Sequence, residues 1–95
     1  LSIAAACIGG MKRCAQMMMR YAERRTISTG RLLENPLTLM RLSDLTAAIA
    51  ATEALVYTIA ERLDAGATVP VEAYTVCKTA APEFLWQATD HLVQM

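Results

Sequence analysis

The stretch YAERRTISTGRLLENPLTL, residues 21–39, separates two long apolar segments and decides how the chain folds. Two adjacent arginines close the first segment, and small or hydroxylated residues follow. Asn35 can then cap the free N–H groups of a new helix, and Pro36 suits its first position because an N–H there would have no partner. We therefore expect a long helix on each side of a polar, cationic corner.

The segment before the corner has helical spacing from residue 2 to residue 25. Two apolar strips run along it, and a helix that is apolar around most of its circumference is normally buried on several sides. Gly9 and Gly10 cost helix propensity, which makes sense if another backbone packs closely there. The main face, with spacings of three and four residues, consists of Ile3, Cys7, Gly10, Cys14, Met17 and Tyr21, and the second strip of Ile8, Met11, Ala15, Met18 and Ala22.

The segment after the corner predicts a helix over residues 36–64. The tripeptide at 64–66 ends it, and Gly66 is the candidate for the left-handed residue that commonly follows a helix. The main apolar stripe consists of Leu42, Leu45, Ile49, Val56, Ile59 and Leu63, with Thr52 filling the gap.

A third helix is expected over residues 70–95, with Pro70 in its first turn and Glu72 near the positive end of the helix dipole. Pro82 falls inside this segment and should kink the helix or divide it. The apolar stripe of this helix consists of Tyr74, Cys77, Ala81, Leu85, Ala88 and Leu92.

These segments predict one domain, residues 1–95, of the all-α class. We expect an up-and-down bundle of three long helices without a sheet, because short connections make consecutive helices antiparallel neighbours. The helices carry more apolar surface than contacts among three helices use. A missing helix or a partner subunit should therefore cover the remainder.

Composition and charge argue against several classes of protein. Hydrophobic residues make up 55% of the 95, and nine basic side chains balance nine acidic ones. A nucleic-acid partner, which needs a basic excess, is not expected. The first apolar run is too short to span a membrane and its positive residues follow it, so we expect no membrane partner. Cys7, Cys14 and Cys77 form no C-x-x-C pair, and we interpret them as reduced core thiols of a cytoplasmic protein, without a disulfide or metal site.

No nucleophile–base arrangement is visible, and we predict no catalytic residue in the chain. The single histidine, His91, is interpreted as a helix-surface residue, since catalytic histidines work with positioned partners. Glu53 lies among apolar residues and is interpreted as a carboxylate at a helix–helix seam, paired with a basic group. General-base catalysis is the alternative for Glu53. The six methionines fit adaptable packing, with a Met-lined cofactor pocket as the alternative.

The arginine corner has two interpretations. Arg20, Arg24 and Arg25 lie around the last turn of the first helix, where cations interact favourably with the negative end of the helix dipole. Arginine also offers a planar fork of donors that suits phosphate, and Thr26 and nearby backbone N–H groups could add donors. A structural helix end and a site for an anionic group are both compatible with these residues.

Three stretches together resemble the C-terminal helical domain of flavin-dependent acyl-CoA dehydrogenases: YAERRTISTGRLL, NPLTLMRLSDL and DHLVQM. That family commonly has an Ala-x-x-Arg-x-x-Phe-Gly corner after a long helix, then a helix with a Leu-Ala-Asp-like element, and later a Val-Gln-apolar-x-Gly-Gly segment. Residues 42–45 fit the second element, residues 73–78 fit an Ala/Lys helix, and residues 93–95 fit the start of the last. The resemblance covers nearly the whole chain in order and implies part of a four-helix bundle.

In that family the corner arginine and neighbouring polar groups bind the flavin dinucleotide of the adjacent subunit. The resemblance carries this role to Arg24, Thr26 and Gln94, with FAD as the cofactor of the parent enzyme. Ile27 stands at the family's aromatic position and Ser28 at its glycine. The family's catalytic glutamate has no counterpart in the chain. The isolated chain is therefore expected to bind flavin weakly or not at all and to be inactive alone.

Two functions are consistent with the sequence. The first is a C-terminal fragment of an FAD-dependent acyl-CoA dehydrogenase, an oxidoreductase that oxidises the α,β carbons of an acyl-CoA substrate. The fragment would supply packing in a homo-oligomer, contacts with the remaining domains of the parent enzyme, and part of the flavin site. The alternative is a non-catalytic helical interaction or oligomerisation module.

Overall fold

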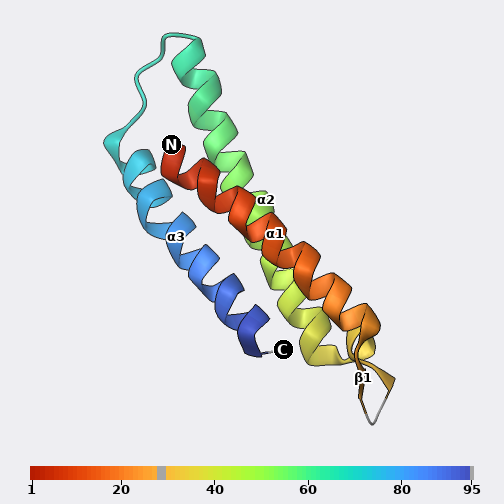
Figure 1. Cartoon of the computed structure of the whole chain (residues 1–95). Helices are drawn as coiled ribbons and strands as arrows, with labels where there is room; N and C mark the ends of the chain where they lie inside the picture. The colour runs from red at the N-terminus through yellow and green to blue at the C-terminus, as the bar shows by residue number, and fades with distance from the viewer. Residues whose placement is uncertain (28–29, 95) are drawn as a thin grey trace.

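The chain folds into three long helices in antiparallel order, as Figure 1 shows for the computed structural model. α1 spans Ser2–Arg24, α2 spans Pro36–Asp64 and α3 spans Val71–Gln94. The predicted all-α class with three long helices is confirmed. The structure describes residues 1–27 and 30–94, apart from the side chains of residues 26 and 33.

The corner between α1 and α2 contains a minimal β-hairpin that the sequence analysis did not foresee. β1 (Thr26–Ile27) pairs antiparallel with β2 (Gly30–Arg31), and the 3-10 helix η1 (Leu32–Glu34) leads into α2. Gly30 has a φ of +127°, and a Cβ atom there would lie 2.8 Å from Oε2 of Glu34. A residue with a side chain would therefore be strained at this position, which explains the glycine. Ser28 lies outside the described residues.

Both ends of α2 carry the caps that the sequence predicted. The Asn35 side chain accepts hydrogen bonds from the N–H groups of Leu37 at 2.9 Å and Thr38 at 3.4 Å. At the other end, Gly66 adopts a φ of +76°. The N–H of Gly66 donates to the Leu63 carbonyl at 3.0 Å, and the N–H of Ala67 donates to the Arg62 carbonyl at 2.9 Å. This pattern is a Schellman motif, so Gly66 is confirmed as the left-handed residue.

The buried face of α1 differs from the predicted main face. Ile3, Met17 and Tyr21 were expected inside, but they are 52%, 42% and 37% exposed. Both strips of α1 are apolar, so spacing could not decide which direction faces the core. The actual core line combines Ala4 with members of the two strips and consists of Ala4, Cys7, Met11, Cys14, Met18 and Ala22.

Of the two α1 glycines, Gly10 lies against a neighbouring helix. A Cβ atom at Gly10 would lie 2.9 Å from Cδ1 of Leu85 on α3, so the close approach is to a side chain, not to the expected backbone. A Cβ atom at Gly9 would meet no described atom within 4 Å, and close packing does not explain this glycine.

The stripes of α2 and α3 lie largely as predicted. In α2 the buried residues are seven apart, at Thr38, Leu45, Thr52 and Ile59, with Leu42, Ile49 and Val56 half-buried between them. Leu63 was predicted to belong to the stripe that faces the core, but this prediction is wrong, because Leu63 is 45% exposed. The last turn of α2 extends past the start of α1 (Figure 1), and residues 61–68 are all exposed.

In α3 the predicted stripe is buried or half-buried throughout. Pro82 is exposed, and α3 runs through it as one helix, so the expected division there is wrong. The kink expected at this proline stays a prediction.

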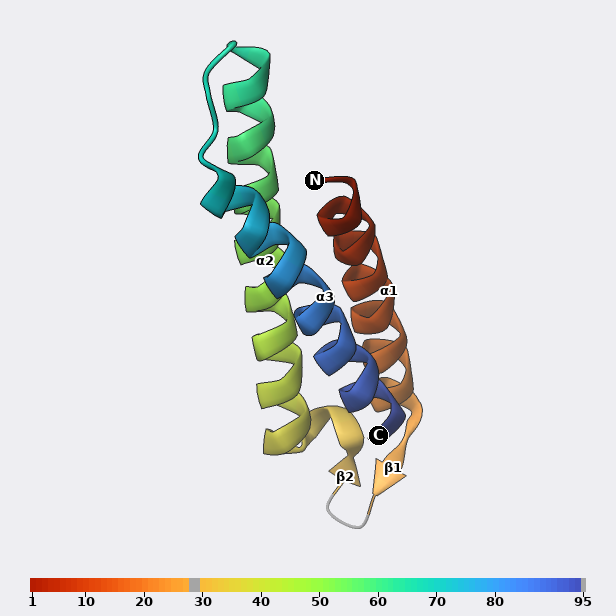
Figure 2. The same cartoon turned by 90° about the vertical axis from the view of Figure 1, so that its left-hand side faces the viewer.

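The molecule is a rod, not a sphere. Its principal extents are 56 × 19 × 17 Å and its radius of gyration is 15.9 Å, against roughly 12.4 Å for a compact domain of this length. Its accessible surface is 6150 Å², about 800 Å² more than a compact monomer of this mass exposes. α1 packs against both other helices, and the hairpin and the C-terminal end of α3 lie at the same end of the rod (Figure 2).

Candidate functional site

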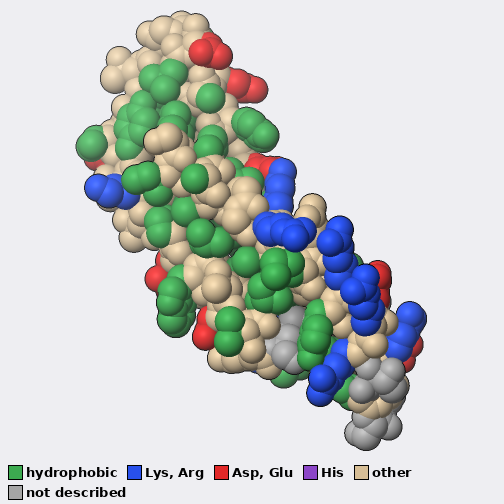
Figure 3. Space-filling view, viewed as in Figure 1, with side chains coloured by type: hydrophobic (Ala, Val, Ile, Leu, Met, Phe, Trp, Pro, Cys, Tyr) green, Lys and Arg blue, Asp and Glu red, His purple; other side chains and the backbone are tan. Residues whose placement is uncertain are grey.

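The hairpin end of the rod gathers the residues that the resemblance singled out. It contains the last turn of α1, the hairpin, the start of α2 and the end of α3 (Figure 2). Basic side chains run along α1 toward this end (Figure 3). Arg24 lies in the last turn of α1 and is exposed. No ion pair or hydrogen bond to another described side chain engages it, so its guanidinium can receive an anion.

The neighbouring arginines differ from Arg24 because they already have partners. The guanidinium of Arg25 lies 5.9 Å from the ring centroid of Tyr21, within the range of a cation–π contact. Nε of Arg31 lies 3.6 Å from Oε1 of Glu34. Among the described side chains, Arg24 thus has no such partner, and the same holds for Arg20 one turn earlier in α1.

The backbone of the corner offers fewer donors than expected. The N–H of Arg25 donates to the Tyr21 carbonyl at 2.9 Å, and the N–H of Leu32 donates to the Arg25 carbonyl at 2.8 Å. Thr26 pairs with Arg31 in the ladder, and its side chain is outside the described part of the chain. A role for Thr26 in ligand binding stays a prediction.

Gln94, the third predicted site residue, belongs to a small network that the sequence analysis missed. Nη2 of Arg41 on α2 donates to its Oε1 at 3.3 Å, and its Nε2 donates to Oδ2 of Asp90 at 3.1 Å. The network joins the first turns of α2 to the end of α3 and adds a further cation to the hairpin end. No sequence signal linked Arg41 to Gln94, because they lie 53 residues apart.

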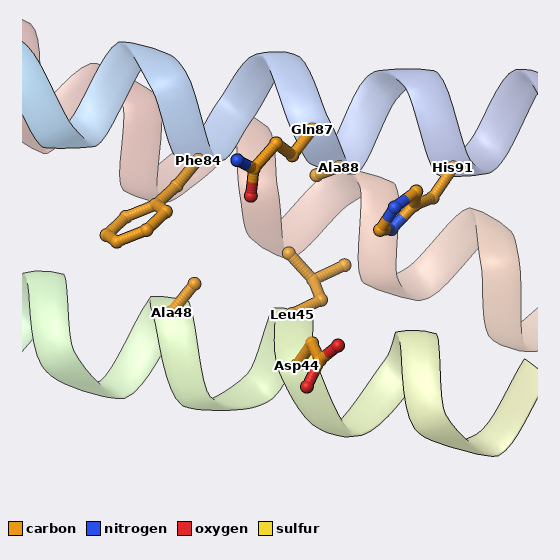
Figure 4. Close-up of a pocket in the computed structure, with 7 residues that line it drawn as sticks. All are labelled: Asp44, Leu45, Ala48, Phe84, Gln87, Ala88 and His91. Carbon is orange, nitrogen blue, oxygen red and sulfur yellow. The ribbon is translucent and has the colours of Figure 1, made fainter.

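A groove between α2 and α3, with α1 behind it, holds the histidine (Figure 4). His91 and Gln87 from α3 point toward Asp44 and Leu45 of α2 around a hollow of about 30 Å³. That volume holds little more than a water molecule. His91 is half-buried and lines this hollow, so the expectation of a plain surface residue is corrected. A larger and more open hollow of about 380 Å³ adjoins it and shares His91, Gln87 and Asp44 in its lining.

The groove continues toward the other end of the rod as an apolar hollow. Phe84 lines both parts, and Cys77 lies at the base of the second. The remaining lining residues are Ala51, Thr52, Leu55, Val76, Ala80 and Ala81. All three cysteines are buried and unpaired, which confirms the prediction of free core thiols.

The predicted role of Glu53 is also confirmed. Its carboxylate forms an ion pair with Lys12 of α1 across the α1–α2 seam. Oε1 of Glu53 is buried and has no other polar partner in the described structure. The hydrogen bond to Glu53 and its negative charge raise the pKa of Lys12 above the usual range. Glu53 therefore acts in packing, and no described acid–base partner supports catalysis there.

The described residues form a bundle of three helices with exposed arginine side chains at its hairpin end. The chain matches the family model described as "Acyl-CoA dehydrogenase, C-terminal domain" over residues 1–95, and it belongs to that family. No curated protein gives a significant match. The resemblance stated from the sequence is thus confirmed.

Proposed function

We propose that this chain is the C-terminal helical part of an FAD-dependent acyl-CoA dehydrogenase. It supplies bundle packing, subunit contacts and part of the flavin site, and it is not catalytic alone. The observation that carries the proposal is the unengaged Arg24 at the same end of the bundle as Gln94. Arg24 and Gln94 would hold the anionic part of the flavin, which in the parent enzyme would supply hydride acceptance from the acyl-CoA substrate.

The hairpin end fits the pyrophosphate of a dinucleotide. Arg24 can present its planar fork to phosphate oxygens without breaking an ion pair or hydrogen bond to any side chain that the structure describes. The Gln94 amide keeps one further N–H after its bond to Asp90, so it can donate to the same ligand. Ile27 is half-buried and offers no aromatic ring for stacking, which supports weak flavin binding by the chain alone.

The α2–α3 groove supports the part of the proposal that concerns the remaining parent domains. The apolar hollow beside Cys77 and Phe84 is open, and its lining includes Thr52, Cys77 and Ala81 from the core stripes of both helices. A fourth helix lying in this groove would cover those stripes and complete a four-helix bundle. The parent would also form a homo-oligomer, since the flavin site lies between adjacent subunits.

We place the protein in the cytoplasm as part of the same proposal. The supporting observation is that Cys7, Cys14 and Cys77 are buried and unpaired. Reduced thiols are typical of reducing compartments, whereas small exported domains commonly pair their cysteines.

The test measures flavin retention in the full-length parent enzyme. Arg24→Ala should weaken FAD affinity roughly 10- to 150-fold, because a hydrogen bond to a charged group contributes about 1.5–3 kcal/mol. Arg24→Lys should recover only part of the loss, since lysine keeps the charge but not the fork. Flavin content after gel filtration measures flavin retention. A fluorescence titration of the apoenzyme with FAD measures the affinity.

Arg25→Ala is the matched control, because Arg25 follows Arg24 directly as the C-cap of α1 and its guanidinium contacts the Tyr21 ring. It should change flavin affinity less than Arg24→Ala. Equal affinities of wild type and Arg24→Ala would contradict the flavin role and leave the interaction-module function.

A further inference from the structure

The side-chain amide of Gln94 is held at both of its ends, by residues from two different helices. Nη2 of Arg41 on α2 donates to Oε1 of Gln94 at 3.3 Å, and Nε2 of Gln94 donates to Oδ2 of Asp90 at 3.1 Å. Arg41 and Asp90 are half-buried, whereas Gln94 is exposed. The two anchors are therefore less accessible than the amide that they hold, which lies where α2 begins and α3 ends (Figure 2).

The chemistry of these partners fixes which way round the amide lies. A guanidinium has only donors and an ionised carboxylate has only acceptors, so Oε1 must face Arg41 and Nε2 must face Asp90. Turning the amide over would set donor against donor and acceptor against acceptor, and both hydrogen bonds would be lost. After these two bonds, one N–H of Nε2 has no partner among the described residues. Gln94 therefore offers a ligand an N–H donor in a fixed orientation.

Fixing the amide in advance favours binding. Glutamine is among the side chains that lose the most rotamer freedom when they are ordered. Because Arg41 and Asp90 order the amide before a ligand arrives, less of that loss falls on the binding step. The two anchors carry opposite charges, so together they orient the amide without adding net attraction for an anion.

We propose that Arg41 and Asp90 are positioning residues for Gln94, which hold its amide so that the free N–H can donate to an acceptor oxygen in the anionic part of the flavin. The inference rests on the proposed function, because that function assigns Gln94 to the flavin site. Asp90 acts through Gln94, since a carboxylate placed directly against an anion would repel it. Arg24 supplies the attraction for the anion, and the network supplies the orientation of the amide.

Asp90→Ala is the decisive variant, because charge and orientation predict opposite results for it. If charge alone mattered, loss of a negative charge near an anion site would strengthen flavin binding. Loss of the anchor should instead weaken FAD affinity about 2- to 12-fold, the range for one hydrogen bond. A fluorescence titration of the full-length apoenzyme with FAD measures the affinity. Asp90→Asn keeps an acceptor oxygen and should recover part of the loss. Unchanged or tighter binding by Asp90→Ala would overturn the inference.

A double-mutant cycle separates positioning of the amide from a general effect on the fold. In a Gln94→Ala background, Asp90→Ala should not weaken FAD affinity further, because its effect passes through the amide. A loss that persisted in that background would overturn the inference. Glu83→Ala is the matched control, since it removes a negative charge from an exposed position of the same helix and should not weaken FAD binding. Circular dichroism shows that the variants fold.

NMR of the 95-residue chain tests the network without flavin. The side-chain amide of Gln94 should be less mobile than that of Gln87, which is exposed and forms no hydrogen bond with the described residues. Asp90→Ala and Arg41→Met should each make the Gln94 amide as mobile as that of Gln87. Heteronuclear NOE values of the two side-chain nitrogens measure this mobility. Equal mobility of both amides in the wild-type chain would overturn the inference.

The variants also distinguish failure of this inference from failure of the proposed function. If Arg24→Ala and Gln94→Ala both leave FAD affinity unchanged, the proposed flavin site is wrong and the inference fails with it. If both weaken FAD affinity but Asp90→Ala does not, the flavin site stands and the positioning role alone is overturned. If Arg24→Ala weakens FAD affinity but Gln94→Ala does not, Gln94 has no flavin contact to position, and the inference is again overturned.

Discussion

Among individual residues, Lys12 and Glu53 show how this chain accommodates a carboxylate between two helices. The ion pair joins α1 to α2, and Oε1 of Glu53 lies buried beneath it. The hydrogen bond to Glu53, followed by its negative charge, raises the pKa of Lys12. A folded-state pKa above the unfolded value of about 10.4 means that the stabilisation is fully present below that value. It is lost as the pH rises through the folded-state pKa.

The raised pKa of Lys12 gives a prediction for Lys12→Met. The variant should melt at a lower temperature than wild type between pH 7 and 9, because Glu53 loses its partner. The difference should shrink as the pH rises above about 10.4, because Lys12 loses its proton first in the unfolded chain and only at a higher pH in the folded protein. Thermal melts across this range measure it. Arg13→Met is the control, since Arg13 is adjacent to Lys12 but donates a hydrogen bond to Gln16 of its own helix. A difference that persists unchanged to pH 12 would contradict the assignment.

Some side-chain contacts in this protein could be predicted from the sequence, and others could not. Glu53 was predictable, because a carboxylate surrounded by apolar residues on a helix needs a cationic partner. The bond between Arg41 and Gln94 was not predictable, because it depends on where two helix ends meet in space. The burial of His91 depends in the same way on how closely α3 approaches α2.

For whole elements, local signals worked best at helix ends. Asn35 and Gly66 were identified from the sequence, because capping depends on a few consecutive residues. The buried face of α1 could not be identified in this way, because two adjacent apolar strips satisfied the helical period equally well. The hairpin was missed because its strands contain two residues each and carry no alternation of polar and apolar side chains.

The cap of α2 supplies the prediction at the element scale. Asn35→Ala should lower the free energy of unfolding by about 1 kcal/mol, because the N–H groups of Leu37 and Thr38 lose their acceptor. Asn35→Asp keeps the acceptor and should remain close to wild type. Denaturant titration measures both variants, and equal stability of wild type and Asn35→Ala would show that the cap contributes nothing.

For the whole molecule, the surplus of apolar surface was visible in the sequence, but its position was not. Composition indicated that three helices could not cover one another fully. Only the structure shows that α1 contacts both neighbours while α2 and α3 leave a groove between them. The three long helices form a rod, and both the α2–α3 groove and the outward side of α2 stay exposed along it.

The unequal lengths of the helices have a consequence for local opening. α2 extends beyond the helices beside it. Residues 61–68 are therefore exposed, and the backbone hydrogen bonds of this last turn have almost no tertiary cover. Amide protons there should exchange with solvent through fraying, at rates close to those of an unprotected chain. Those near Leu45 and Thr52 should exchange only through opening of the bundle. Deuterium uptake along α2 should therefore fall from its C-terminal end inward, and uniform protection along the helix would show that the overhanging turn is covered.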